Sequence, residues 1–532
     1  MPHLTRRHFL SSTVAVGASL RHRPLRAQGA ERRGGVLVVA ADTEPRNLNP
    51  ALVASNGVFY VASKVIEPLA EMGANGTLIP RLATSWEGSS DGRSVRFQLR
   101  DGVTWHDGKP FSSADVAFSA MQLWKPLQNL GRVVFKDLER VETPDMRTAV
   151  LHFSAPTPFQ LVRNALPALS SVVPKHLYDG TDINANPANI QLVGTGPFRF
   201  VEHRPGQFYR LERNPDYWER DRPYLDGIVY QVLPDRAAIA TALEADRIQL
   251  AAFSAVPLAD LERISKVAGI KVIPEGYEGI TYQLTVEINH RRKEFSDPRV
   301  RRAIAHAIDR QFVVDTIFLG YAKPSTGPIP QFDTQFYAAE AAMPGFDLRR
   351  ANALLDEAGY ARGSGGTRFQ VRLLPAPWFE QTRQFGDYLR QALRAVGIDA
   401  QIINNDAAAH TRAVYTDHAF DLAVGSPVYR NDPAISTTIL YQGGLPAGVP
   451  FSNQYGFDSP AMNDVIAKAA VTVQDAERVR LYKEFQRLAA IEIPLVHVAE
   501  FTFITVARDK VHNVANNPRW ATSHWADTWL AA

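Results

Sequence analysis

The length of the chain is the feature that most restricts its fold. A single hydrophobic core stops growing at about 250 to 300 residues, whereas this chain has 532 residues. The sequence therefore predicts two or three domains. Hydrophobic residues make up 45% of the chain and charged residues 21%, which is the balance of an ordinary globular protein. No run approaches the roughly 18 apolar residues of a membrane-spanning helix, so we expect no membrane crossing after the leader.

The first 29 residues have the composition of an export signal. Two adjacent arginines precede a mildly apolar stretch over residues 9–20, and small residues at 27–30 offer a cleavage site. This order resembles a twin-arginine signal peptide; the alternative is a basic tail that happens to precede alanines and serines. We expect a twin-arginine translocon to read the segment and a protease to remove it. The expected signal residues are Arg6, Arg7, Phe9 and Leu10.

Charge and cysteine content exclude several classes of function. The formal charge is +3, but five arginines and no acidic residue lie in the leader, which leaves 53 basic residues against 55 acidic ones. Nucleic-acid binding needs clustered basic residues, so we expect no nucleic-acid partner. The chain has no cysteine, which excludes disulfides, thiolate metal sites, cysteine nucleophiles and a lipid-anchored cysteine. We expect the mature protein to be free in the periplasm.

Hydrophobic periodicity predicts a mixture of strands and helices. Strands are expected over 36–40, 95–99 and 150–153, and the apolar run 493–507 is expected to return to a sheet that begins much earlier. Helices are expected from Pro298 to Gly320 after an Asp297 cap, from 348 to 358 after an Asp347 cap, and over 475–490.

The stretch "TWHDGKPFSSAD" places His106 beside Asp107, as a catalytic dyad would. The same stretch has the composition of a turn, and Ser112 with Asp115 matches a capping box. No GxSxG, HExxH or P-loop motif accompanies it. We therefore interpret His106 as architecture, and Gly194–Gly196 as a turn because Pro197 follows it and no helix opens there. A hydrolase that uses scattered carboxylates is the enzymatic alternative.

A series of segments resembles one known family. "WEGSSDGRSVRFQLRDGVTWHDGKPFSSADVAFS" (86–119) looks like the signature segment of family 5 of the extracellular solute-binding proteins, the peptide, opine and nickel class of ABC importers. "GTGPFRF", "RNPDYW", "FSDPRVRRAIAHAIDR", "ANALLDEAGY" and "YRNDP" follow in the same order. The resemblance covers essentially the whole chain after the leader.

The resemblance implies an α/β, two-lobed periplasmic binding protein of type II, the Venus-flytrap architecture, with an additional inserted subdomain. The lobes are joined by two crossover strands, and a ligand held between them favours the closed state. The implied organisation is a signal peptide (1–29), the first part of lobe I (30–74), an inserted subdomain of lobe I (75–192), the second part of lobe I (193–282), lobe II (283–500) and a return to lobe I (501–532).

The resemblance also implies which loops face the cleft. The expected ligand-binding residues are Ser55, Asn56, Tyr282, Trp378, Phe379, Tyr429, Arg430 and Asp432. Peptide-binding members of the family hold the ligand's α-ammonium with an aspartate three residues before the acidic residue of the (D/E)P dipeptide; Tyr429 stands there in this chain. A neutral hydroxyl does not compensate a buried ammonium, whereas Arg430 suits a carboxylate.

The sequence thus predicts the periplasmic binding component of an ABC transporter rather than an enzyme. It would capture a small polar organic solute and deliver it to a permease in the inner membrane, without a cofactor or metal and as a monomer. Short peptides are the alternative ligand. A receptor or chaperone on the same scaffold is the alternative role.

Overall fold

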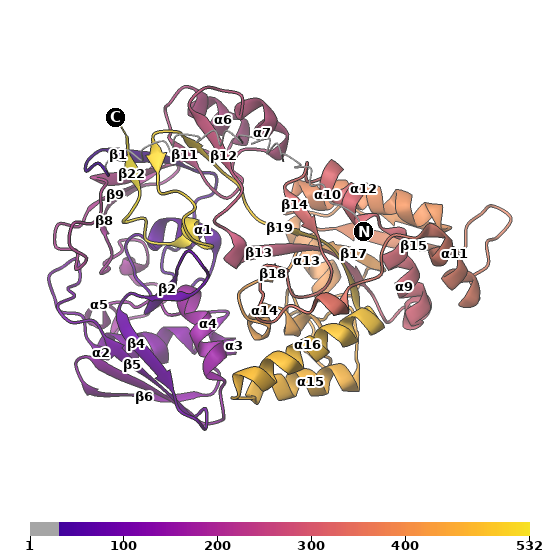
Figure 1. Cartoon of the computed structure of the whole chain (residues 1–532), viewed down its shortest axis with the longest axis horizontal. Helices are drawn as coiled ribbons and strands as arrows, with labels where there is room; N and C mark the ends of the chain where they lie inside the picture. Colours follow the sequence, from indigo (N-terminus) through magenta and orange to yellow (C-terminus); the bar gives the residue numbers. More distant parts are fainter. Residues whose placement is uncertain (1–30, 532) are drawn as a thin grey trace, which may run out of the picture.

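The computed structural model describes residues 31–531 and contains two large sheets, one in each lobe (Figure 1). The residues of the expected export signal, Arg6, Arg7, Phe9 and Leu10, lie outside the described part. We call the part built on the sheet that contains Val36–Ala41 the first lobe, and the part built on the sheet that contains Thr281–Ile288 the second lobe. This is the two-lobed α/β architecture that the resemblance implied.

The first lobe's sheet has seven strands, and the strand expected near Val36 runs through its centre. Leu37 and Val39 are fully buried on that strand, which pairs in parallel with both of its neighbours. In spatial order the strands are β12 (Ile270–Ile273), β20 (Thr505–Arg508), β11 (Leu250–Ala251), β1 (Val36–Ala41), β10 (Gly227–Val232), β9 (Phe208–Arg213) and β8 (Phe198–Arg204).

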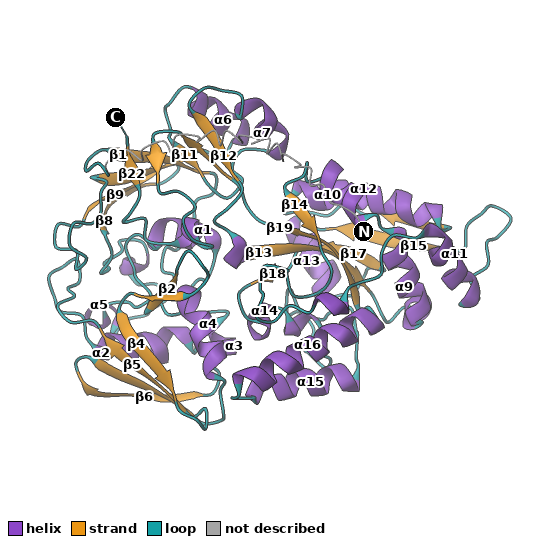
Figure 2. Cartoon of the chain, in the orientation of Figure 1, coloured by secondary structure: helices purple, strands orange, loops and turns teal. Residues whose placement is uncertain are grey.

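The second lobe's sheet mixes parallel and antiparallel strands and lies among helices (Figure 2). Its strands are β14 (Ala322–Pro324), β19 (Leu495–Phe501), β13 (Thr281–Ile288), β17 (Leu422–Gly425), β15 (Phe369–Pro375) and β16 (Ile398–Ile402), with β18 (Val428–Tyr429) paired to β13. Its main helices are α9 (Pro298–Ala307), α10 (Arg310–Thr316), α11 (Leu348–Glu357), α12 (Glu380–Ala395), α13 (Ala407–Tyr415), α15 (Pro460–Val471) and α16 (Asp475–Glu492).

The chain passes between the lobes twice. It enters the second lobe at β13 and leaves it between β19 and β20. β13 and β19 are antiparallel neighbours, so both passages lie side by side at the centre of the molecule (Figure 1). The predicted return of the apolar run 493–507 is confirmed, because β20 pairs with β11 and β12 of the first lobe.

A smaller four-stranded sheet lies in the first half of the chain. Its strands are β4 (Ala83–Gly88), β5 (Ser94–Leu99), β7 (Thr148–Phe153) and β6 (Leu138–Asp145), all antiparallel. The strands expected at 95–99 and 150–153 are therefore confirmed as neighbours. The hairpin of β2 (Ala70–Met72) and β3 (Leu78–Pro80) crosses position 75, where the inserted subdomain is expected to begin.

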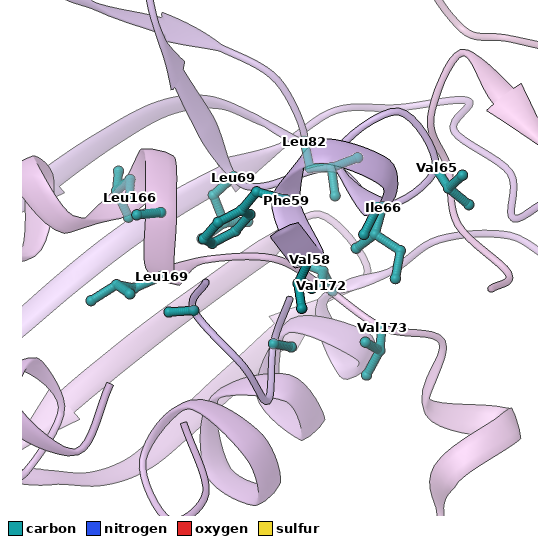
Figure 3. Close-up of a cluster of buried hydrophobic side chains, with 14 of the residues drawn as sticks. Val58, Phe59, Val65, Ile66, Leu69, Leu82, Leu166, Leu169, Val172 and Val173 are labelled. Carbon is teal, nitrogen blue, oxygen red and sulfur yellow. The ribbon is translucent and has the colours of Figure 1, made fainter. Parts of the chain in front are cut away.

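This smaller sheet shares a hydrophobic core with the rest of the first lobe. Helix α1 (Asn56–Ala62) contributes Val58 and Phe59, and helix α4 (Phe159–Leu169) contributes Leu166 and Leu169, to one buried cluster (Figure 3). Because the core is continuous, α4 is anchored to the body of the first lobe.

The helix predictions are confirmed for α11 and wrong for the segment after Pro298. Asp347 caps α11 as expected, by accepting a hydrogen bond from the Arg350 backbone. The single helix expected from Pro298 to Gly320 is instead two helices, α9 and α10, because Asp309 accepts a hydrogen bond from the Phe312 backbone and starts a new helix there.

A buried ion pair lies where the lobes meet. Arg478 of α16 donates two hydrogen bonds to Asp432, at 2.8 and 2.7 Å, and both side chains are 0% exposed. Helix α4 of the first lobe completes the network: Gln160 accepts a hydrogen bond from Arg478 at 2.8 Å, and Asn164 donates one to Asp432 at 3.2 Å. The pair therefore belongs to the second lobe, and the first lobe covers it.

Removing one member of this pair should destabilise the protein strongly. We expect Arg478→Met to lower the free energy of unfolding by about 3–5 kcal/mol, because Asp432 would remain buried without its counter-ion. Chemical denaturation followed by circular dichroism measures the change. Arg480→Met, two residues along the same helix in an exposed pair with Glu477, is the matched control and should cost about 1 kcal/mol or less. Equal losses in the two variants would contradict this view of the pair.

Candidate ligand-binding site

A cavity of about 650 Å³ lies between the lobes. Residues 129–133 of the first lobe form one wall, and loops of the second lobe form the other. Four of the expected ligand-binding residues line it: Tyr282, Trp378, Phe379 and Arg430. The structure thus brings together side chains that are up to about 150 positions apart in the sequence.

Aromatic side chains form much of the second-lobe wall. Trp378 follows strand β15 and meets Phe451, with ring centroids 5.7 Å apart. Its indole N–H donates a hydrogen bond to Ser426 Oγ at 3.0 Å, which fixes the ring. Phe379, the residue before α12, meets Tyr282 with centroids 5.3 Å apart. This wall suits an apolar or ring-bearing part of a solute.

Arg430 is the unusual polar group of the cavity. Its Nε and Nη1 atoms are buried and have no hydrogen-bond partner among residues 31–531. Burial lowers the pKa of the guanidinium, and the nearby Tyr282 hydroxyl opposes that change. Buried N–H groups of a cation without acceptors are costly, and an anion in the cavity would supply the missing acceptors.

Ser55 and Asn56 lie at the start of α1. The Ser55 hydroxyl accepts a hydrogen bond from the Val58 backbone and caps the helix, so its local role is architectural. Asn56 Nδ2 donates to the Tyr282 hydroxyl at 3.4 Å, across the boundary between the lobes, and Asn56 Oδ1 is buried without a partner in the described chain. Asn56 therefore touches the site through Tyr282.

Tyr429 and Asp432 do not line this cavity. Tyr429 is 1% exposed, packs in the second lobe's core and donates its hydroxyl hydrogen to Asp333. Asp432 is held by Arg478 and caps helix α14 (Pro433–Ser436) through the Ala434 backbone. Tyr429 is the second residue of β18, and side chains alternate along a strand: Val428 lines the cavity, so Tyr429 points into the lobe.

A second cavity, of about 760 Å³, also lies between the lobes. Asn431 lines it, while the preceding Arg430 lines the first cavity. Asp333 and Glu275 also face the second cavity, and burial raises the pKa of Asp333 to about 6. The consecutive residues 430 and 431 therefore face two interlobe spaces of different character, one with an unpaired cation and one with carboxylates.

Two parts of the site were not found from the sequence. Residues 129–133 lie in the range 75–192, where the inserted subdomain is expected, and no local pattern marks them. Phe451 lies in the loop "GGLPAGVPFSN" and has a φ of 56°, an unusual conformation for a residue other than glycine. The glycines and prolines indicated a loop, but nothing local indicated that it folds over the cavity.

His106 is architectural, as its turn-rich sequence predicted. Its Nε2 lies 2.9 Å from the Gly196 carbonyl, and its Nδ1 accepts a hydrogen bond from the Gly194 backbone at 3.3 Å. Burial lowers the pKa of the imidazole to about 4, so it is neutral near pH 7. A Cβ on Gly194 would lie 1.7 Å from the Val65 carbonyl, so this turn needs glycine for close backbone contact. The ring therefore ties two loops together.

Comparison with known proteins places these features in a family. The model of the bacterial extracellular solute-binding proteins, family 5, middle part, matches residues 77–448. A glutathione-binding protein of Pectobacterium atrosepticum is 27% identical over 445 residues, which covers 82% of each chain. A dipeptide-binding protein of Escherichia coli is 24% identical over 514 residues, 91% of this chain and 92% of the relative.

A solved structure agrees in fold along nearly the whole chain. The binding protein AgaA of Agrobacterium tumefaciens, solved with agropinic acid, superposes with a TM-score of 0.75 and 26% identity. The superposition covers 94% of this chain and 99% of AgaA.

No helix within residues 31–531 is both long and apolar enough to cross a bilayer. The family match spans most of the chain, the lobes enclose a cavity, and His106 has a structural role. The chain belongs to family 5 of the bacterial extracellular solute-binding proteins, the solute-binding components of ABC importers, and not to a class of enzymes.

Proposed function

We propose that this protein captures a small organic anion between its lobes and delivers it to an ABC permease in the inner membrane. The observation that carries this choice of ligand is Arg430, whose Nε and Nη1 atoms are buried at the cavity without a partner among residues 31–531. A carboxylate would supply two acceptors to its free N–H groups. The aromatic wall around Trp378 would hold the rest of the solute.

Short peptides are the alternative ligand, since relatives are named for glutathione and dipeptides. Both kinds of peptide carry a carboxylate, so Arg430 alone does not separate them from other acids. The α-ammonium of a peptide does separate peptides from other acids. In this chain Tyr429 replaces the aspartate of peptide-binding members and is turned away from the cavity, so it offers an ammonium no counter-ion. The acid bound to AgaA gives a precedent for an acidic ligand on this fold.

Closure of the lobes around the solute would require bending at the two passages between them. We place the hinges at 282–286 and 496–501, where β13 and β19 lie as antiparallel neighbours. Two adjacent strands at one position allow rotation about a single axis. The closed contact is the one described at α4, where Gln160 and Asn164 meet the Arg478–Asp432 pair.

Binding measurements separate the two ligand classes. In calorimetry we expect organic acids to bind and their neutral amides and unmodified di- to pentapeptides to bind at least tenfold more weakly. Arg430→Gln should weaken acid binding by roughly 10- to 100-fold, the value of charge-assisted hydrogen bonds of about 1.5–3 kcal/mol. Arg430→Lys keeps the positive charge but loses the planar guanidinium fork. Its affinity for acids should therefore lie between those of the wild type and Arg430→Gln.

The control is Arg350→Gln, which removes an exposed arginine of α11 that pairs with Glu357; its affinity should equal that of the wild type. Micromolar or tighter binding of unmodified peptides, abolished when their N-termini are blocked, would refute the choice of an acid over a peptide.

We also propose that the protein reaches the periplasm through the twin-arginine translocon and is not lipid-anchored. Replacing Arg6 and Arg7 together with lysine should leave uncleaved precursor in the cytoplasm, because the translocon reads the arginine pair. Cell fractionation and immunoblotting measure this. Undiminished periplasmic accumulation of the double variant would exclude the twin-arginine route.

A further inference from the structure

Arg519 is a second buried arginine at the boundary between the lobes. It lies before the short helix η6 (Trp520–Thr522), in the segment that has returned to the first lobe, and is 3% exposed. Its Nη1 donates a hydrogen bond to the Gly279 carbonyl at 3.0 Å. Its Nη2 is buried and has no partner among residues 31–531.

The Arg519 side chain is fixed in place by close packing. A Cβ on Gly279 would lie 2.6 Å from Arg519 Cγ, so only glycine leaves room for the arginine stem. Gly279 belongs to helix η3 (Glu278–Ile280), which precedes the first passage between the lobes. The guanidinium is therefore held against that passage.

Arg430 reaches the same place from the second lobe. It directly follows strand β18, and β18 packs against η3, the helix whose Gly279 holds Arg519. Burial, and after it the positive charge of Arg430, lower the pKa of Arg519 to about 9, which agrees with two nearby cations. One arginine from each lobe is thus held against helix η3, at the boundary between the lobes.

No carboxylate in the described chain pairs with either arginine. Within residues 31–531, no acidic oxygen lies within 4.0 Å of Arg430 or Arg519. Glu71 favours the charged form of Arg519 from a distance, but it is already committed to Arg81 at 2.9 Å and lies 3.2 Å from His524. Two like charges in a poorly solvated position repel each other and lose hydration.

We infer that Arg430 and Arg519 form one oxyanion subsite that spans the boundary between the lobes. A carboxylate between them would accept hydrogen bonds from both lobes at once and stabilise the closed arrangement. Without an anion, their repulsion opposes closure. The identity of the solute rests on the proposed function; the effect of the two charges on closure does not.

The test uses the mature protein freed of solute by unfolding, dialysis and refolding. Small-angle X-ray scattering gives the radius of gyration of the wild type and of Arg519→Gln, which keeps a donor for the Gly279 carbonyl but is neutral. We expect the neutral variant to be more compact than the wild type, because the repulsion is gone. Arg519→Lys, which keeps the charge, should match the wild type.

A second arm uses sodium sulfate as the oxyanion probe, against sodium chloride at equal ionic strength. Sulfate should make the wild type more compact and raise its melting temperature by a few degrees, and it should do so less in Arg519→Gln. If Arg519→Gln does not fold, Arg430→Gln removes the other charge, at the cavity surface. This variant should also be more compact than the wild type and respond less to sulfate. Arg350→Gln controls for the loss of an arginine elsewhere.

The inference is wrong if the neutral variants have the radius of gyration of the wild type, or if sulfate acts equally on the wild type and Arg519→Gln. These outcomes are distinct from failure of the proposed function. If the calorimetry finds no organic acid that binds, compact neutral variants would still support the subsite. If acids bind and neutral variants are not compact, the proposed function stands and the subsite does not.

Discussion

Arginine side chains at the boundary between the lobes need counter-ions, and the rest of the structure depends on how this need is met. One arginine there, Arg478, has its counter-ion in Asp432 and is capped by amides from the first lobe. Two others, Arg430 and Arg519, lack one in the described chain. The satisfied pair stabilises the closed contact whether or not a solute is present. Because Arg430 and Arg519 have no counter-ion among residues 31–531, closure of the lobes at the cavity depends on whether an anion enters the cavity.

Two features of the fold allow closure of the lobes to depend on the solute. Helix α4 is anchored in the first lobe's core by Leu166 and Leu169 (Figure 3). It reaches the second lobe with Gln160 and Asn164. The two passages at β13 and β19 lie side by side (Figure 1). In the proposed closure, bending at these two strands would let the lobes rotate with little change inside either lobe.

Local features of the fold were predictable from the sequence, and contacts between distant segments were not. Asp347 caps its helix through a neighbour three residues away, so the pattern was sufficient. Asp309 acts in the same way, and its capping role was missed because the apolar spacing continued past it. The return of the chain through β20 followed from the length of its apolar run.

The residues of the candidate site, too, were only partly predictable from the sequence. Trp378, Phe379, Tyr282 and Arg430 were placed at the cleft by resemblance, and the cavity contains them. Tyr429 was placed there too, but the alternation of β18 turns it into the core toward Asp333. No sequence pattern marked Arg519. Its role depends on Gly279, 240 positions earlier, and on an arginine of the other lobe.

The most direct test of the central claim is native mass spectrometry of the protein purified from the periplasm. We expect one small organic anion per chain, released on denaturation, with no free α-ammonium group. An unmodified short peptide or a cationic solute as the retained molecule would contradict it.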